Sequence, residues 1–369
     1  MAVYIGLLCF VLGTCLLSMY KELKPKYFLF LSFLAMTLVL GLRGVTVGED
    51  TSNYIQIIER AAQMSWGSIL ADFPKTEWQF ISYGGFSGYS AQIETVFLAC
   101  CKLLMKIFHN AQAVIFVIAA ITSILIARFI RDNVEKNSDI YLVTIVYMCE
   151  SMFMNSFNLS RQMLAMGIAV QALACVRNRK FKRAIVILAA AIMIHMSAIV
   201  AVIPVLLLAW PDKKFACRAS LIAAAAAVPA IPLLRKIVAV LLPAYLEYFE
   251  VNYWKPSLNG TIILWLIIVA LLILMWMNRC NGEEELWLSS LMMLYLSIEI
   301  IGLRYVMIGR VASYFRLFIG LFLCQGEKTL SWQYKVLFRM GIVLLVCAAF
   351  LRYAASPARL YVPFWQNVL

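Results

Sequence analysis

Residues 177–183 read RNRKFKR, and the chain continues over residues 184–209 as AIVILAAAIMIHMSAIVAVIPVLLLA. The second stretch contains no Lys, Arg, Asp or Glu. A helix of about 20 apolar residues spans the hydrocarbon core of a bilayer, so residues 184–209 are long enough to cross a membrane. The basic residues before them favour a cytoplasmic loop, because Lys and Arg accumulate on that side of the membrane.

The composition of the whole chain agrees with this stretch. Of its 369 residues, 64% are hydrophobic and 14% are charged, whereas about a quarter of the residues of a soluble domain are charged. A soluble protein could not bury so much apolar surface, and lipid cannot satisfy the edges of an open sheet. We therefore predict an all-α, polytopic transmembrane helical bundle with about ten to twelve spans, some of them half-spans.

The predicted spans follow one another along the whole chain, which we interpret as a single integral membrane domain over residues 1–369. They cover residues 2–19, 27–42, 94–108, 111–130, 140–157, 162–176, 184–209, 219–242, 261–277, 286–303, 311–325 and 336–354. Two longer connections separate them. One is a long outer segment at 43–93, and the other is an outer aromatic segment at 243–259.

The topology of these spans contains a conflict. The KELKPK loop at 21–26 and the basic loop at 177–183 both favour the cytoplasmic side. If every span between residues 43 and 177 crosses the membrane fully, the second loop falls outside. Segment 94–108 and segment 184–209, which contains Pro204, are therefore candidates for half-spans. Such broken helices are tolerated where they line a polar cavity.

The formal net charge is +13. In a soluble protein this value would indicate nucleic acid, but Lys and Arg in cytoplasmic loops of a membrane protein face anionic lipid. We therefore expect membrane lipid, and no nucleic acid, as a partner. A second set of arginines lies at span ends or inside apolar runs, at positions 43, 161, 304, 310 and 316. These positions are costly unless an anionic group neutralises the charge.

Two polar motifs carry arginines of this second set. After Arg43 the chain reads GVTVGEDTSNY, in which Asp50 lies in a helix N-cap region and Tyr54 follows one turn later. Residues 155–162 read NSFNLSRQ, and Arg161 opens an apolar helix. A guanidinium there suits a phosphate, because it offers two parallel donors and keeps its charge. In both motifs the alternative is an arginine that extends to the lipid headgroups.

His195 lies about twelve residues beyond the basic loop, which places it deep in the bilayer. The chain has only two histidines. A titratable group at this depth is a functional candidate. The alternative is a structural histidine that hydrogen-bonds a neighbouring helix.

A last group of polar residues surrounds one connection near the C-terminal end. Arg304 lies in this connection, and Arg310 and Tyr314 share a helix face at spacing i, i+4. These arginines need either an anionic ligand or an internal partner, for which Glu299 is a candidate. Glu150, inside another apolar span, either pairs with an arginine or lines a cavity.

Several motifs of nucleotide and metal chemistry do not occur in the sequence. It contains no P-loop, no glycine fingerprint of dinucleotide binding, no HExxH and no DxD-type pair of acids. We therefore expect no cofactor, no metal site and a metal-independent mechanism.

The ordered set of motifs resembles the EpsG branch of the Wzy-type polysaccharide polymerases. The matching pieces are the stretch from Arg43 to Tyr54, the Phe157-x-x-x-Arg161-Gln162 entry, the basic loop, the His195-x-Ser197-Ala198 element and the Arg310-x-x-x-Tyr314 step. They follow the family's order and cover roughly residues 1–365. The resemblance also implies similarity to lipid-dependent, membrane-embedded (GT-C-like) glycosyltransferases.

This resemblance implies a function. Such proteins polymerise O-antigen, exopolysaccharide or capsule repeat units in the bacterial cytoplasmic (inner) membrane. They transfer a growing glycan from undecaprenyl diphosphate to the non-reducing end of the next lipid-linked unit at the outer face, in some cases with a chain-length regulator. Two alternatives remain open: a flippase or transporter of the same lipid-linked oligosaccharide, and an O-antigen-ligase-like transferase.

The residues suit that chemistry, because a diphosphate leaving group needs fixed positive charge in the transition state. We expect Arg161 and Arg310 to bind the diphosphate with help from Arg43, and the acceptor hydroxyl to be deprotonated by Asp50 or His195, with Asp50 favoured. The further residues expected at the substrate are Tyr54, Gln162, Arg304 and Tyr314. Aromatic residues of the two outer segments either stack on sugar faces or lie in the interfacial belt.

Overall fold

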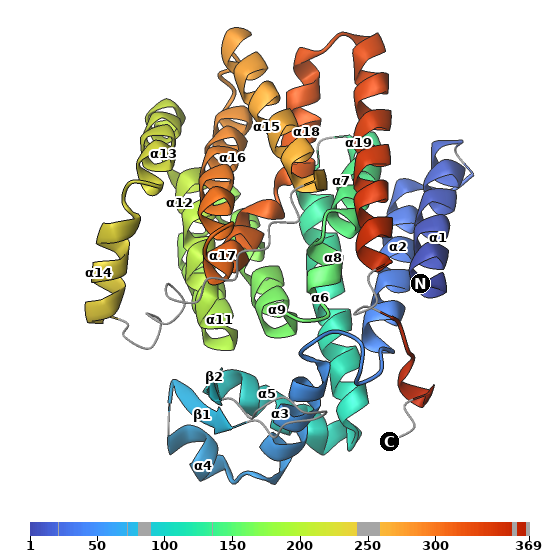
Figure 1. Cartoon of the computed structure of the whole chain (residues 1–369), viewed down its shortest axis with the longest axis vertical. Coiled ribbons are helices and arrows are strands. Elements are labelled where there is room, and N and C mark those ends of the chain that lie inside the picture. The colour runs from blue at the N-terminus through green and yellow to red at the C-terminus, as the bar shows by residue number, and fades with distance from the viewer. Residues whose placement is uncertain are drawn as a thin grey trace. The chain divides into compact units, whose positions relative to one another are not determined.

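The computed structural model describes residues 1–20, 22–71, 73–79, 90–134, 136–241, 259–355 and 360–366, and these are mostly helical (Figure 1). The chain forms two compact units. The first consists of Met1–Ala201 and Cys347–Leu369, and the second of Val202–Val346. The single domain expected from the sequence stays a prediction. The outer aromatic segment lies, up to residue 258, outside the described residues.

The first unit contains the two strands and most of the helices, which follow the chain order. They are α1 (Ala2–Met19), α2 (Pro25–Gly41), α3 (Thr51–Gln63), α4 (Trp66–Ala71), β1 (Lys75–Gln79), β2 (Ser90–Glu94), α5 (Thr95–Phe108), α6 (Ala111–Asn133), α7 (Asn137–Cys149), α8 (Met152–Asn155), α9 (Ser160–Ala169), α10 (Gln171–Arg177), α11 (Phe181–Ile194) and the 3₁₀ turns η1 (Met196–Ala201) and η5 (Phe364–Gln366).

The second unit is helical throughout its described part. Its elements are α12 (Val202–Ala209), α13 (Lys213–Ala227), α14 (Ile231–Leu241), α15 (Asn259–Met277), α16 (Glu283–Gly302), α17 (Val306–Arg316), α18 (Ile319–Gly326) and the short η3 (Glu327–Thr329). The last long helix, α19 (Trp332–Ala354), begins in this unit and ends in the first.

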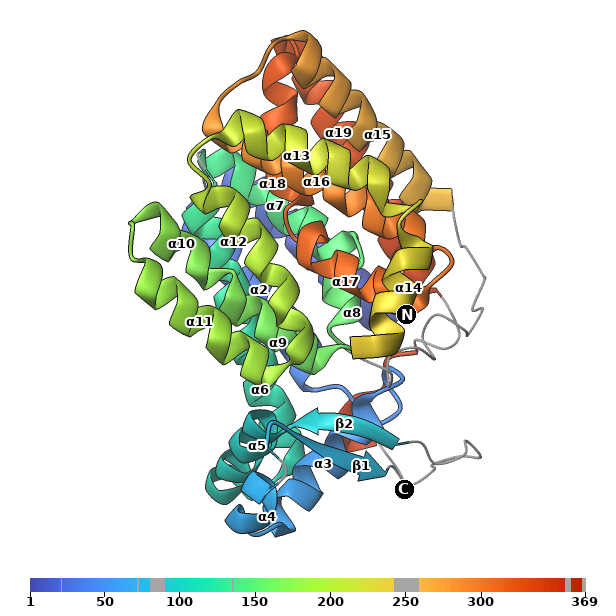
Figure 2. The same ribbon diagram turned by 90° about the vertical axis from the view of Figure 1, so that its left-hand side faces the viewer.

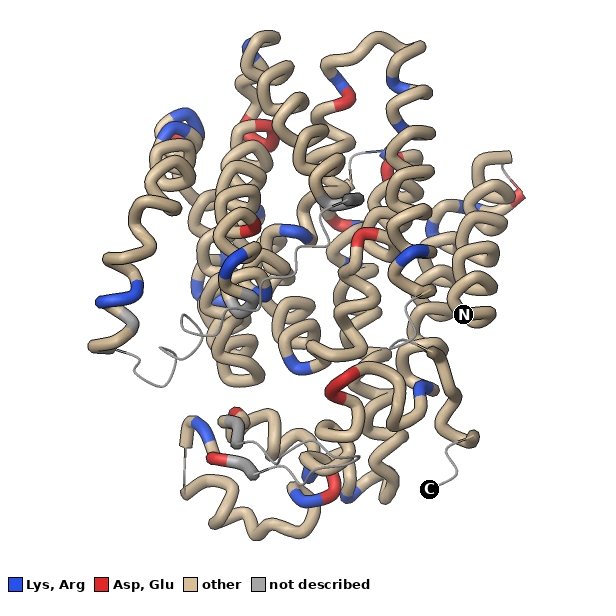
Figure 3. The backbone as a smooth tube through the Cα atoms, in the orientation of Figure 1, with Lys and Arg blue, Asp and Glu red and all other residues tan. Residues whose placement is uncertain are grey.

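Helices long and apolar enough to cross a membrane make this a membrane protein. Among the described residues there are four, α1, α6, α16 and α19, or six if each of two bent helix pairs forms one span. Figure 3 shows that α1 and α15 carry no charged residue along their lengths. The count is smaller than the expected ten to twelve, because several apolar segments are divided into helices too short to span about 30 Å.

The predicted span at 184–209 is divided in this way. Helix α11 ends at Ile194, His195 adopts an extended backbone with φ −156° and ψ 119°, and η1 and α12 follow. The break therefore lies at His195 and not at Pro204, which is accommodated in the first turn of α12. The segment is thus broken, as considered from the sequence, and a half-span at this place stays a prediction.

Four other predicted spans are also interrupted. The span at 140–157 is divided into α7 and α8, the span at 162–176 into α9 and α10, the span at 219–242 into α13 and α14, and the span at 311–325 into α17 and α18. The third pair bends by 87° and the fourth by 50°. Segment 94–108 forms α5, whose 14 residues are about 21 Å long, shorter than the hydrocarbon core.

A β-hairpin in the outer segment is the exception to the expected all-α fold. Strands β1 and β2 pair antiparallel, with Lys75 opposite Glu94. Both views show the hairpin beside α3, α4 and α5 (Figures 1 and 2). The N–H of Thr95 donates to the carbonyl of Pro74 and ties the start of α5 to the hairpin. The last strand residue, Glu94, is thereby held at the N-terminus of α5.

The C-terminal residues of the chain pack against the end of α2. The Gly44 N–H donates to the Val362 carbonyl at 2.7 Å, and the Phe364 N–H donates to the Leu42 carbonyl at 3.0 Å. The hydroxyl of Tyr361 donates to the Val39 carbonyl at 2.9 Å, and its ring lies edge-on to Tyr4 of α1. The start and the end of the chain therefore stabilise the same region of the first unit.

Close backbone approach explains a glycine at the end of α2. A Cβ added to Gly41 would lie 2.5 Å from the ring of Phe116 and 3.1 Å from its Cα on α6. Alanine normally favours a helix over glycine, but here it would overpack the contact between α2 and α6.

We expect Gly41→Ala to lower the stability of the first unit by about 1–3 kcal/mol. The matched control is Gly13→Ala in α1, where an added Cβ meets nothing within 4 Å and should be neutral or slightly stabilising. Thermal unfolding of the purified protein in detergent measures both variants. Equal melting temperatures for the two would contradict this account of the α2–α6 contact.

Candidate active site

One buried carboxylate joins three chain segments in the first unit. Glu94 is 4% exposed. Its Oε2 accepts a hydrogen bond from Nη1 of Arg161 at 2.6 Å, and its Oε1 lies 2.9 Å from Nδ1 of His195. The backbone N–H of Met196 donates to the same Oε1 at 2.9 Å. The carboxylate therefore holds two of the predicted site residues, Arg161 and His195, in one cluster.

Each member of the cluster comes from the end of an element. Glu94 ends β2, Arg161 lies in the first turn of α9, and His195 follows the last residue of α11. Figure 2 shows α9, α10 and α11 side by side. A side chain at a helix end can reach a neighbouring segment without a kink in the helix. The extended backbone at His195 directs its ring and the next N–H to the same oxygen of Glu94.

The charges around Glu94 determine its protonation. Burial by itself raises the pKa of this carboxyl, but the hydrogen bonds from His195 and Met196 and the charges of His195 and Arg161 outweigh burial and lower the pKa to about 2. Glu94 is therefore ionised at neutral pH. As an ionised group it accepts hydrogen bonds only.

Tyr54 fixes the chain just before Arg161. Its hydroxyl donates to the carbonyl of Asn158 at 3.2 Å and accepts from the backbone N–H of Arg161 at 3.3 Å. Burial raises the pKa of the Tyr54 phenol above its ordinary value, so the hydroxyl keeps its proton. Tyr54 was expected at the substrate. It lies on α3, and its hydroxyl contacts the N-terminus of α9.

Arg43 is 1% exposed and binds protein groups. Its Nε donates to Thr51 Oγ1 at 2.9 Å, Nη1 to the Leu40 carbonyl at 2.7 Å and Nη2 to Ser160 Oγ at 3.0 Å. The guanidinium thus joins the end of α2 to the starts of α3 and α9. Its expected contribution to diphosphate binding stays a prediction.

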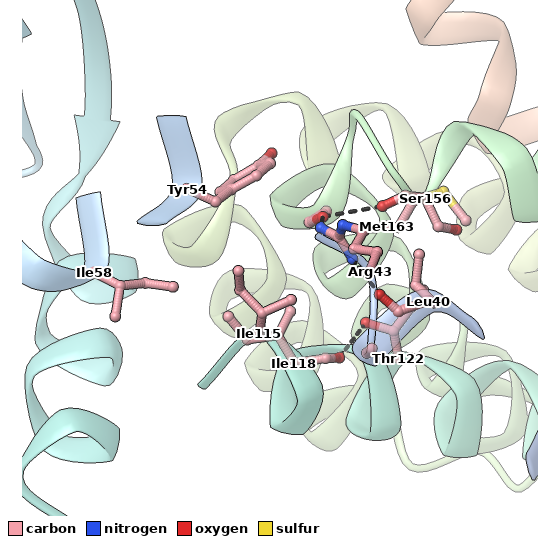
Figure 4. Close-up of a pocket in the computed structure, with 11 residues that line it drawn as sticks. Leu40, Arg43, Tyr54, Ile58, Ile115, Ile118, Thr122, Ser156 and Met163 are labelled. Atoms are coloured by element: carbon pink, nitrogen blue, oxygen red, sulfur yellow. Dashed lines mark hydrogen bonds between the residues drawn. The ribbon is translucent and has the colours of Figure 1, made fainter. Parts of the chain in front are cut away.

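A small, mainly apolar pocket adjoins Arg43. Figure 4 shows Arg43 and Tyr54 directed toward it, with Ile115 and Ile118 of α6 among the lining residues. Ser160, which accepts from Arg43, also lines the pocket and precedes Arg161 in the chain. The pocket therefore lies directly beside the start of α9.

Asp50 and Gln162 flank these residues. Asp50 is the N-cap residue of α3, as the sequence predicts, and its Oδ1 lies 3.4 Å from Nδ2 of Asn53. Gln162 is buried in the first turn of α9. Their expected roles as base and as substrate ligand stay predictions.

The other predicted residues belong to the second unit. Arg304 and Arg310 are exposed, and Tyr314 is buried on α17. Arg316 forms an ion pair with Glu299, the acid considered from the sequence as an internal partner of the arginines in this region. The guanidinium of Arg304 lies over the ring of Tyr305 at 5.5 Å. A role for Arg304, Arg310 and Tyr314 in substrate binding stays a prediction.

Glu94 is the residue that sequence reasoning missed. It is the first residue of the predicted span at 94–108 and has no motif of its own. The signal that would have found it is the demand of a half-buried histidine and a half-buried arginine for an acidic partner. Among the residues that the structure describes, no group of three or more His, Cys, Asp or Glu side chains could hold a metal ion.

Fold and site together define a class: a helical membrane protein in which a buried glutamate joins a partly exposed arginine and histidine at the end of a short helix. The EpsG family model matches residues 26–365, nearly the whole chain. The chain therefore belongs to the EpsG family, which is associated with Wzy-type polymerases. Comparisons with curated proteins and with solved structures gave no match.

The lowered pKa of Glu94 links the cluster to stability. A carboxyl whose pKa falls from 4.5 to about 2 on folding contributes stability above pH 4.5, and this contribution is lost as the pH falls toward 2. The shift corresponds to roughly 3 kcal/mol.

We expect the wild type to lose this stability in thermal unfolding measured from neutral to acidic pH. In Glu94→Gln we expect no such loss. Glu77→Gln, on the exposed face of the same hairpin, should keep it; an identical acid profile in all three proteins would contradict the prediction.

Proposed function

We propose that the chain is a polysaccharide polymerase of the bacterial cytoplasmic membrane. It transfers a growing glycan from undecaprenyl diphosphate to the non-reducing end of a lipid-linked repeat unit at the outer face. Membership of the EpsG family supports polymerisation of this kind. The single observation that carries the chemistry is the cluster of Arg161, Glu94 and His195.

The reaction in this proposal is a displacement at a sugar carbon. The acceptor hydroxyl oxygen forms a bond to the anomeric carbon of the donor glycan. The bond from that carbon to the diphosphate oxygen breaks, and its electron pair leaves with the lipid diphosphate. The hydroxyl proton moves to a base of the protein. The protein therefore needs a fixed cation for the leaving group and a base for the acceptor.

Arg161 supplies the cation in this proposal. Its side chain is 15% exposed, so an anion can approach it in surroundings of low polarity. Its Nε is buried and has no hydrogen-bond partner among the described residues. An unpaired buried donor costs about 1–3 kcal/mol. In this proposal the diphosphate meets the exposed part of the side chain, because Nε itself is inaccessible to solvent.

His195 supplies the base. A general base must reach the acceptor proton and keep a fixed orientation. The Nδ1 of His195 is engaged with Glu94, and its side chain is 25% exposed. Its other ring nitrogen, Nε2, forms no hydrogen bond with the part of the chain that the structure describes, and in this proposal it meets the acceptor. The sequence favours Asp50 for this role, whereas the geometry favours His195, because Glu94 orients its ring.

The partners in this proposal follow from the reaction. They are lipid-linked repeat units, membrane lipid and, where chain length is controlled, a regulator protein. No cofactor and no metal ion takes part in the proposed steps.

The function is tested with purified protein in lipid nanodiscs and lipid-linked repeat units isolated from cells that lack the gene. We expect a ladder of longer glycans and release of undecaprenyl diphosphate. Arg161→Lys should lower product formation about 100-fold, because it removes the planar donor fork. Arg128→Lys, an exposed arginine on α6, serves as the matched control and should retain activity. In sealed proteoliposomes, movement of intact substrate across the membrane without a ladder would instead indicate a flippase. Transfer to a different acceptor would indicate a ligase.

The identity of the base is tested by two substitutions in the same assay. We expect His195→Gln to lower the turnover rate by about 10²–10⁴-fold, the range for loss of a general base. Asp50→Asn should lower it much less. The reverse order would assign the base to Asp50. Melting temperatures of both variants show whether they fold as the wild type does.

A further inference from the structure

Glu94 accepts donors from three directions with two oxygens. Nη1 of Arg161 approaches Oε2, while Nδ1 of His195 and the N–H of Met196 approach Oε1. The guanidinium and the backbone N–H cannot act as acceptors. Two of the three neighbours thus require acceptor oxygens, and each oxygen of Glu94 faces one of them.

This arrangement determines the tautomer of His195. Oε1 already accepts the Met196 N–H and belongs to an ionised carboxylate, so Nδ1 of the ring must carry the proton that points toward it. In the neutral imidazole the lone pair then lies on Nε2. The other ring nitrogen, away from Glu94, is therefore the one able to accept a proton.

The same carboxylate orients Arg161. Nη1 of Arg161 lies 2.6 Å from Oε2 of Glu94, and this contact fixes one edge of the planar guanidinium. The carboxylate is itself fixed at the junction of β2 and α5, where Thr95 bonds to Pro74. One rigid group therefore sets the position of two side chains that reach it from sequence separations of 67 and 101 residues.

We infer that Glu94 is the positioning residue of the proposed reaction: it holds His195 as the Nδ1–H tautomer with Nε2 as the base, and it aligns Arg161 for the diphosphate. This inference rests on the proposed roles of His195 and Arg161. Glu94 acts only through these two side chains.

A glutamine at this position keeps the shape but cannot serve both sides. If its carbonyl oxygen faces Arg161, its NH₂ group faces the Met196 N–H and donates to Nδ1, which favours the Nε2–H tautomer. If its oxygen faces His195, the NH₂ group faces the guanidinium, and a buried donor is left without a partner. Glu94→Gln is therefore the variant that separates charge and acceptor geometry from side-chain volume.

The tautomer can be measured directly, because the chain has only two histidines. Protein labelled with ¹⁵N-histidine and studied at about pH 8.5, above the ordinary histidine pKa of ~6.5, distinguishes protonated from unprotonated ring nitrogens. We expect the Nδ1–H form for His195 in the wild type and a change toward Nε2–H in Glu94→Gln. The exposed His109, at the end of α5, is the internal reference. An Nε2–H form in the wild type, or an unchanged tautomer in Glu94→Gln, would overturn the inference.

Glycan transfer by the same proteins provides the second readout. We expect Glu94→Gln to lower the turnover rate at saturating donor at least 100-fold, and Glu77→Gln, the same change on the exposed strand of this hairpin, to stay within about twofold of the wild type. Combining Glu94→Gln with His195→Gln should cost less than the product of the two single losses, because both changes disable the same base, while the misaligned Arg161 keeps a loss of its own. Full activity of Glu94→Gln would overturn the inference. If the wild type makes no glycan at all, the proposed function fails, and the tautomer measurement still decides whether Glu94 positions the ring.

Discussion

A charge removed from water costs several kcal/mol unless a partner of opposite sign meets it. This constraint organises the interior of both units, because buried acids contact arginines from other helices or turns. The pairs are Glu94 with Arg161, Glu299 with Arg316, and Glu327 with Arg339. The first pair differs from the others in one respect: its carboxylate also binds a titratable ring, His195. That additional contact is what distinguishes a candidate site from a structural ion pair.

Broken helices place this site where it is. A continuous helix over residues 184–209 would use the backbone N–H of Met196 within the helix and would leave none for Glu94. The break after Ile194 releases that N–H and directs the ring beside it to the same oxygen. Likewise α9 begins at Ser160, so Arg161 lies in a first turn where backbone donors have no partner within the helix. Tyr54 accepts from one of them. The irregular backbone is thus satisfied by side chains of the site.

The sequence predicts the helical membrane class and the family well, because apolar length and the order of motifs are local properties. It also marks Arg161 and His195 as candidates for the site, since a polar residue inside an apolar run is visible without a structure. Glu94 could not be found in the same way, because its partners lie far away along the chain and pairing depends on distance. The hairpin at 75–94 was missed for a related reason: KTEWQ and SAQIE show little of the β-branched, alternating pattern that indicates strands. The sequence around an arginine at the end of a span, such as Arg43, does not show whether its side chain extends to the lipid headgroups or into the interior of the protein.

The contact between the C-terminal residues and the end of α2 has a consequence for biosynthesis. Tyr361 binds the Val39 carbonyl across 322 residues of sequence, and Val362 binds the loop that contains Arg43. During translation the first helices leave the ribosome long before these partners exist. The backbone groups at Leu42 and Gly44 therefore lack these partners until residues 362–364 have been made. The first unit is completed late even though most of it is made early.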